Sequence, residues 1–284
     1  MLATLLTICI VVFVYMHVVY QLKTSNDLEI FNLGIPDKIQ LEEVCGMRQP
    51  ILFDFWQDEL AQCIPSNFQY DAFDVNVVDN SGSILLCVEK AKLLFSKSKC
   101  LTERNSDFLK ETLLCRVMEK HDLLLRPHMI ARTQYDLIFG STDACTKLRY
   151  SNWYRNYFLV ASGEVVVKLA PPRNSRVLDV QKDANDFYSL TNAWDAPKVK
   201  FLELVMKPGQ MVYIPAYWWY SFKLGKDACM LGFQYCTCMN VVAILPDMLN
   251  TFLQRQNTIK LHQEPNLPVI SVMKTVNDIA KEIL

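Results

Sequence analysis

The stretch from Lys207 to Phe222, KPGQMVYIPAYWWYSF, constrains the fold more than any other part of the chain. Pro208-Gly209 is typical of a tight turn, and residues 211–214 have the composition of a strand. Pro215 ends that strand because proline has no N–H for the hydrogen-bond ladder. The bulky aromatic residues 217–219 follow, and a second strand is predicted directly after them. A strand, a proline–aromatic corner and another strand favour a double-sheet or barrel architecture over a helical one.

The rest of the chain divides into strand-like and helix-like parts. Short apolar runs with turn residues between them recur from Ile130 onward, as in a double-sheet jelly roll. Helical spacing of apolar residues predicts helices over residues 37–44, 88–95 and 107–120 before this part, and over 245–261 and 267–284 after it. The amphipathic pattern of the last segment fits packing on its own barrel, on a second copy of the chain or on another protein. The fold class expected is therefore mainly β with helices.

The N-terminus is apolar over residues 2–20, with no Lys or Arg before Lys23. This length suffices to cross a hydrocarbon core of about 30 Å at about 1.5 Å per residue. A cleaved signal peptide would have a basic start, a shorter apolar core and a small-residue cleavage site, and none of these is present. We therefore predict a retained single-pass anchor over residues 1–22. The position of Lys23 favours a cytosolic location of the following domain.

Charge and cysteine content exclude several function classes. The net charge is −1 and the basic residues are scattered, whereas nucleic-acid binding needs a clustered basic face. The ten cysteines include one close pair, Cys236 and Cys238, but a zinc site needs a second pair. Reduced, partly buried thiols are expected instead. A Gly-rich phosphate loop, a Gly-x-Ser-x-Gly elbow and a His-Glu-x-x-His motif are all absent from the sequence.

Two blocks carry a family resemblance: residues 147–172, KLRYSNWYRNYFLVASGEVVVKLAPP, and the stretch 207–222. They resemble the LHYDxxxN…GxKxxxLxPP and GDxxxIPxxWWH motifs of the JmjC/cupin-type 2-oxoglutarate oxygenases, the asparaginyl-hydroxylase-like branch in particular. The resemblance implies a double-stranded β-helix, or jelly roll, over residues 45–245, with a connector at 23–44 and a helical tail at 246–284. An anchored domain of this kind also resembles proteins of large eukaryotic DNA viruses.

The residues that carry the chemistry of that family are replaced here. Two histidines and a carboxylate hold its iron, and a lysine pairs with 2-oxoglutarate. The matching positions hold Arg149, Ser151 and Tyr220 for the iron ligands and Val165 for the lysine, whereas Asn156 is retained. A guanidinium has no lone pair and repels a cation, and a neutral hydroxyl or phenol is a poor ligand. The resemblance therefore implies neither a metal, nor a cofactor, nor catalytic residues.

Two fates of the former pocket follow from these replacements. A polar network could fill it, formed by Arg149, Tyr154, Arg155, Glu164 and Tyr220, because a buried arginine must find acceptors. Alternatively, the same residues could bind a small ligand. Trp218 and Trp219 are expected to form the core of the corner beside this pocket.

The leading hypothesis is a membrane-anchored, catalytically inactive cupin-like protein with a structural or protein-interaction role, for example in a virion membrane. Its expected partners are the membrane, through residues 2–20, and proteins, through the C-terminal helix, with a homo-oligomer as one form. The alternatives are an active Fe(II)- and 2-oxoglutarate-dependent oxygenase with a non-standard site, and a small-ligand-binding cupin module.

Overall fold

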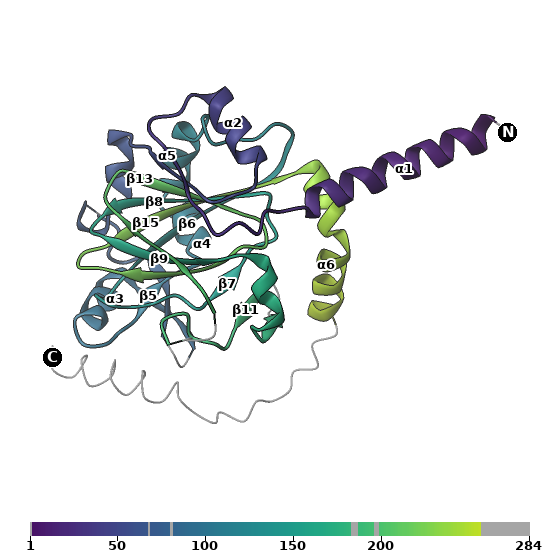
Figure 1. Ribbon diagram of the computed structural model, residues 1–284. Coiled ribbons are helices and arrows are strands. Elements are labelled where there is room, and N and C mark those ends of the chain that lie inside the picture. The colour runs from purple at the N-terminus through teal and green to yellow at the C-terminus, as the bar shows by residue number, and fades with distance from the viewer. Residues whose placement is uncertain (1, 68, 80–81, 183–186, 196–198, 257–284) are drawn as a thin grey trace.

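The computed structural model describes residues 2–67, 69–79, 82–182, 187–195 and 199–256. Two sheets face one another, several helices cover the outside of the larger sheet, and one long helix projects away from the domain (Figure 1). The structure thus confirms a mixed architecture with many antiparallel strands.

The projecting helix is α1 (Leu2–Leu22), which is long and apolar enough to cross a membrane, with a mean hydropathy of 2.5. Its end is fixed to the domain by the buried side chain of Arg48. The Nη1 atom of Arg48 donates to the carbonyl oxygens of Gln21 and Lys23, each at 2.7 Å, and the guanidinium lies 4.8 Å from the ring centroid of Tyr20. A cation at the carbonyl end of a helix also stabilises the helix dipole. The direction of α1 is therefore set by the domain.

Within the described residues, the larger sheet has nine strands and the smaller sheet has six. The larger sheet has the order β1 (Phe31–Leu33), β2 (Ile51–Asp54), β13 (Gln210–Pro215), β8 (Arg155–Ser162), β15 (Cys229–Thr237), β6 (Ile130–Gly140), β5 (Leu101–Thr102), β3 (Asp74–Val78) and β4 (Ser83–Cys87). The smaller sheet has the order β10 (Val180–Lys182), β11 (Phe187–Ser189), β7 (Arg149–Tyr150), β14 (Trp219–Leu224), β9 (Val165–Ala170) and β12 (Leu202–Met206). From β6 to β9 and again from β12 to β15, each strand of the chain crosses to the other sheet.

The helices that pack on the domain are short, apart from α6, which has 19 residues. They are α2 (Lys38–Gly46), α3 (Val88–Phe95), α4 (Ser106–Glu111), α5 (Leu114–His121) and α6 (Cys238–Gln256), with 3-10 turns η1 (Asp58–Cys63), η2 (Pro65–Asn67) and η3 (Pro172–Arg176). The carboxylate of Asp37 accepts from the Gln40 amide at 2.7 Å and caps α2, which confirms the predicted start. The helix α6 begins at Cys238 rather than at Leu245, and residues 267–284 lie outside the described part.

The single helix predicted over residues 107–120 is wrong, because α4 and α5 are separated at Leu113. Leu113 has a left-handed backbone with φ of +60°, and the hydroxyl of Thr112 donates back to the Phe108 carbonyl at 2.7 Å. Five positions of a straight helix turn through about 500°, which would put Leu109 and Leu114 on different faces. The break allows both leucines to be buried.

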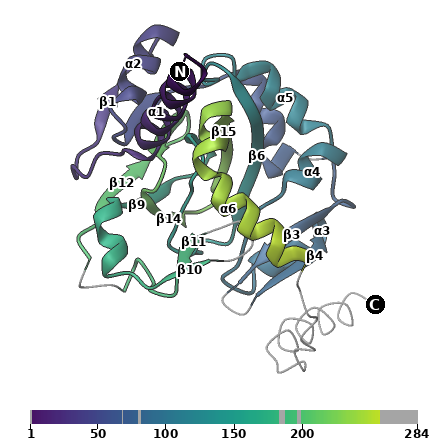
Figure 2. The same ribbon diagram turned by 90° about the vertical axis from the view of Figure 1, so that its right-hand side faces the viewer.

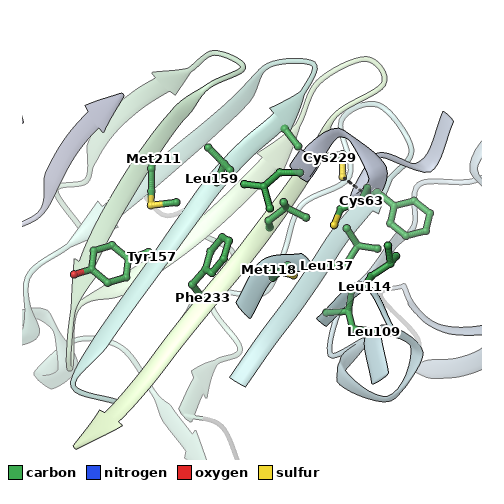
Figure 3. Packing of buried hydrophobic residues seen from close by; sticks show 14 of the residues in the cluster. Cys63, Leu109, Leu114, Met118, Leu137, Tyr157, Leu159, Met211, Cys229 and Phe233 are labelled. Carbon is green, nitrogen blue, oxygen red and sulfur yellow. Dashed lines mark hydrogen bonds between the residues drawn. The ribbon is translucent and has the colours of Figure 1, made fainter. Parts of the chain in front are cut away.

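The central strands of the larger sheet, β13, β8 and β15, are buried on both faces, which positions the site. Successive side chains of a strand point to opposite faces, so Tyr157 and Leu159 of β8 face the helices whereas Phe158 and Val160 face the smaller sheet. Figure 3 shows the first of these layers, in which Tyr157, Leu159, Met211 and Phe233 of the sheet pack with Cys63, Leu109, Leu114 and Met118. The second layer is the inter-sheet core, and the candidate site lies at one end of it.

Candidate functional site

Strand pairing brings together two of the three positions that match iron ligands. Strands β7 and β14 are antiparallel neighbours, and Tyr220 lies directly opposite Arg149. Both side chains are buried, and the Arg149 guanidinium lies 5.6 Å from the centroid of the Tyr220 ring. This is a cation–π contact in which the ring face attracts the positive charge.

The positive charge of Arg149 is balanced by Glu103, which follows β5 in the larger sheet. The Nη1 atom of Arg149 donates to Oε2 of Glu103 at 2.7 Å, and the two side chains are only 9% and 6% exposed. Burying either charge alone would be strongly destabilising, so the two groups are buried together as an ion pair. Glu103 is not recognisable in the sequence as a partner of Arg149, because it lies 46 positions away and no local pattern links the two residues.

A second carboxylate, Asp136 of β6, lies near this ion pair. It accepts from the backbone amides of Arg104 at 3.0 Å and Asn105 at 2.7 Å. Burial raises the pKa of Asp136 to about 6, although the backbone amides and the charge of Arg149 act in the opposite direction. The site therefore holds one carboxylate in an ion pair with Arg149 and a second whose pKa is raised by burial.

The third ligand position, Ser151, takes part in the local backbone structure. Its hydroxyl oxygen accepts from the Trp153 amide at 3.1 Å, and its carbonyl accepts from the Tyr217 amide at 2.8 Å. The retained Asn156 is completely buried, and its Nδ2 donates to the carbonyl of Ile214 at 3.2 Å. Both residues hold neighbouring segments in place.

Aromatic rings fill the part of the inter-sheet core around Tyr220. Phe158, Tyr220 and Phe222 have ring centroids 4.8 to 5.4 Å apart. Val165, at the position of the family's lysine, is fully buried opposite Leu224. Its apolar side chain offers no charge to a carboxylate ligand, so this part of the former pocket is filled by hydrophobic packing.

Three of the five residues of the expected polar network lie apart from Arg149 and Tyr220. Arg155 lies on the helix-facing side of β8 and binds Glu42 of α2 through both guanidinium ends, at 3.0 and 2.5 Å. The ring of Tyr154 packs on the guanidinium of Arg155, with 5.4 Å between the ring centroid and the Cζ atom. Glu164 is exposed in the turn between β8 and β9. The alternation of side chains along β8 explains the placement of Arg155, because odd-numbered residues of β8 face away from the smaller sheet.

The two tryptophans are core residues, as predicted. Both are fully buried, but they belong to different clusters. Trp218 packs in the inter-sheet core with Tyr220, whereas Trp219 packs on the other side with Leu148 and donates from Nε1 to the Ser175 hydroxyl at 2.8 Å. Tyr217, just before them, has a left-handed backbone with φ of +68° at the corner between β13 and β14.

The residues at the matched positions do not fit iron. A paired guanidinium, a buried phenol and a hydroxyl engaged with the backbone supply no facial set of ligands. In the part of the chain that the structure describes, no group of three or more His, Cys, Asp or Glu side chains is placed to hold a metal ion.

Two hollows are found elsewhere on the domain. One, of about 620 Å³, is lined by residues including Trp56, His121 and Gly209. The other, of about 510 Å³, is lined by residues including Lys168 and Trp194. Neither includes a residue of the candidate site.

A comparison of the sequence with models of protein families identifies the family of the domain. The model of a family described as a cupin-like domain matches residues 89–240, from α3 to the start of α6. No match is found among curated proteins. The matched part includes Glu103, Arg149 and Tyr220 and is more than half of the 284 residues. The chain therefore belongs to the cupin-like domain family.

Proposed function

We propose that this protein is a membrane-anchored, non-catalytic member of the cupin-like family with a structural or protein-interaction role. The observation that carries the proposal is the buried ion pair between Arg149 and Glu103 at the position of the first iron ligand. A metal cation at that place would meet the positive charge of the Arg149 guanidinium instead of the lone pair of a ligand atom. Removing Arg149 from its place would leave Glu103 buried and uncompensated, which is costly.

The proposal includes a finer fold and branch. The alternation of β6–β9 and β12–β15 between the two sheets supports a double-stranded β-helix of eight strands. The motif blocks around Arg149 and Tyr220 support a degenerate relative of the asparaginyl-hydroxylase-like branch. Because the two aligned ligand positions are cross-strand neighbours, their places in the scaffold agree with a site that has lost its ligands.

The catalytic part is tested with the full chain in phosphatidylcholine nanodiscs, purified without a chelating tag. We expect no stoichiometric Fe(II), no binding of 2-oxoglutarate and no conversion of it to succinate. The matched control is the variant R149H/S151D/Y220H, which places two histidines and a carboxylate at the three matched positions. Gain of Fe(II) binding by this variant alone supports a scaffold that lost its site through these three residues. Iron-dependent turnover by the unaltered chain would establish the alternative, an oxygenase with a non-standard site.

The membrane part rests on α1, which is exposed, apolar and of spanning length. Lys23 after the span supports a cytosolic domain. A place in a virion membrane is supported by the resemblance in organisation to proteins of large DNA viruses. Resistance of the full chain to extraction from membranes at alkaline pH, together with protease access to the domain, tests anchoring and orientation separately.

A further inference from the structure

Helix α6 presents an uncharged apolar face to its surroundings. The outward positions, each at least 40% exposed, are Val242, Leu245, Met248, Leu249, Phe252 and Leu253. They recur at intervals of three and four residues, so they lie along one side of the helix. The charged residue within positions 238–253, Asp247, is paired with Lys182 at 3.0 Å. A helix face in contact with water normally carries charge, so this face requires an apolar partner.

The opposite side of α6 is fixed to the domain near the candidate site. Asn240 donates from Nδ2 to the carbonyl of Asn152 at 3.2 Å, one residue after Ser151. Ala243 and Ile244 are buried. These contacts determine which face of α6 is exposed and prevent the helix from turning its apolar side inward.

The position of α1 shows what lies in front of that face. Helices α1 and α6 contact each other, and Arg48 holds the end of α1 against the domain. In Figure 1, α6 lies along the side of the domain from which α1 projects, and it runs across the direction of α1. In Figure 2, that side faces the viewer, with α1 pointing outward and α6 lying lengthwise over the domain. A bilayer crossed by α1 would therefore have its surface along α6.

We propose that α6 is an interfacial helix, with its apolar face inserted into the phospholipid bilayer beside the entry point of α1. This inference rests on the proposed anchoring by α1. Interfacial helices combine an apolar face with a position parallel to the membrane plane, as α6 does here. Arg173 is exposed and lies close to the end of α1, because its backbone amide donates to Oδ1 of Asn26 at 3.1 Å. Its side chain is therefore available to lipid headgroups beside α1.

This arrangement gives the barrel a fixed orientation. The segment at Asn152, which follows Ser151, is bonded to Asn240 of α6, so this part of the domain faces the membrane. The opposite end and the helices on the outer face of the larger sheet remain accessible to soluble partners.

Site-specific photocrosslinking tests the proposal in the full chain in phosphatidylcholine nanodiscs. Benzoylphenylalanine replaces, one at a time, Leu249 and Phe252 on α6, Val11 in α1, and Leu123, which is 71% exposed. Leu123 follows α5, which Figure 1 shows on the side of the domain away from α6, so it is the matched exposed control. Adducts with phospholipid are measured by mass spectrometry. We expect lipid adducts at positions 11, 249 and 252, several-fold above those at 123.

The positions separate the two proposals. Lipid adducts at 11 without adducts at 249 and 252 overturn the inference about α6 and leave the anchor in place. The absence of lipid adducts at all four positions overturns both. Crosslinks from 249 or 252 to residues 257–284 or to a second copy, in place of lipid, identify another occupant of the apolar face and also overturn the inference.

Discussion

Two buried arginine–glutamate pairs on opposite faces of the larger sheet show how similar contacts serve different roles. The inner pair, Arg149 with Glu103, lies between the sheets, and both side chains are less than 10% exposed. The outer pair, Arg155 with Glu42, holds α2 against β8, and Glu42 is 23% exposed. Glu42 also has a second cation, Lys38, at 3.4 Å. Only the inner pair includes a residue, Arg149, at a position that the motif resemblance matches to an iron ligand.

The two pairs differ in how strongly the stability of the buried carboxylate depends on its arginine. A carboxylate that loses its partner is destabilised by burial, and the penalty falls when water or another cation reaches it. Glu103 is enclosed, whereas Glu42 has partial solvent access and Lys38. We therefore expect loss of the arginine to lower the free energy of unfolding more at the inner pair than at the outer pair.

The largest effect is expected for R149M, which leaves the Glu103 carboxylate buried without its guanidinium. We expect the free energy of unfolding to fall by about 3–5 kcal/mol. Chemical denaturation of the full chain in detergent micelles, followed by tryptophan fluorescence, measures the change. The double variant R149M/E103L removes both charges and should recover most of the loss. A single variant as stable as the unaltered chain would contradict the ion pair.

The pH dependence of stability should differ between the two regions, and Asp136 dominates the inner one. Its pKa is raised from 3.8 to about 6, so its contribution to folding is fully present below pH 3.8 and is lost as the pH rises through 6. The full change corresponds to about 3 kcal/mol at about 1.4 kcal/mol per pKa unit. Denaturation between pH 4 and 7 measures it, and D136N should lack this component.

Glu42 in the outer region should show the opposite sign. Burial alone would raise the pKa of Glu42, but the hydrogen bond and charge of Arg155, together with Lys38, hold it below 4.5. Its contribution is therefore present above pH 4.5 and is lost as the pH falls through the lowered pKa. The E42Q variant should lose this acid-dependent component and keep the component of Asp136. If the free energy of unfolding depended on pH in the same way in D136N and E42Q, the opposite signs expected for the two regions would be wrong.

A smaller loss is expected for R155M in the outer pair. Glu42 keeps Lys38 and partial solvent access, so we expect a decrease of about 1–2 kcal/mol in the free energy of unfolding. The same denaturation assay applies, with K38M as the control for the second cation. The double variant R155M/K38M should lose more than the two single variants together. A loss for R155M equal to that for R149M would show that solvent access does not distinguish the pairs.

The smallest effect is expected for S151A at the third ligand position. Its hydroxyl makes one hydrogen bond, to the Trp153 amide, in a partly exposed segment. We expect a loss of at most about 1 kcal/mol, measured by thermal unfolding. The matched control is S221A, because the Ser221 hydroxyl is completely buried and bonded to both Thr146 and Trp194. A loss for S151A that exceeds the loss for S221A would indicate a role for Ser151 beyond the local turn.

Local patterns in the sequence were sufficient for several features. The apolar run of α1, the strand–corner–strand of β13 and β14 and the cap of α2 depend on neighbouring residues, which sequence periodicity reports directly. The residue types at the three matched positions, Arg149, Ser151 and Tyr220, are likewise visible without coordinates, because the chemistry of a side chain does not depend on the fold.

Tertiary structure decided which of these residues meet. Glu103 reaches Arg149 across 46 positions and Glu42 reaches Arg155 across 113, distances over which no periodic pattern operates. The face occupied by Arg155 follows from the register of β8, and the break before α5 follows from the burial of two leucines. The position of α6 beside α1 was also fixed only by packing. Side-chain type and local periodicity are properties of the sequence, whereas partners and faces are set by which distant segments pack together.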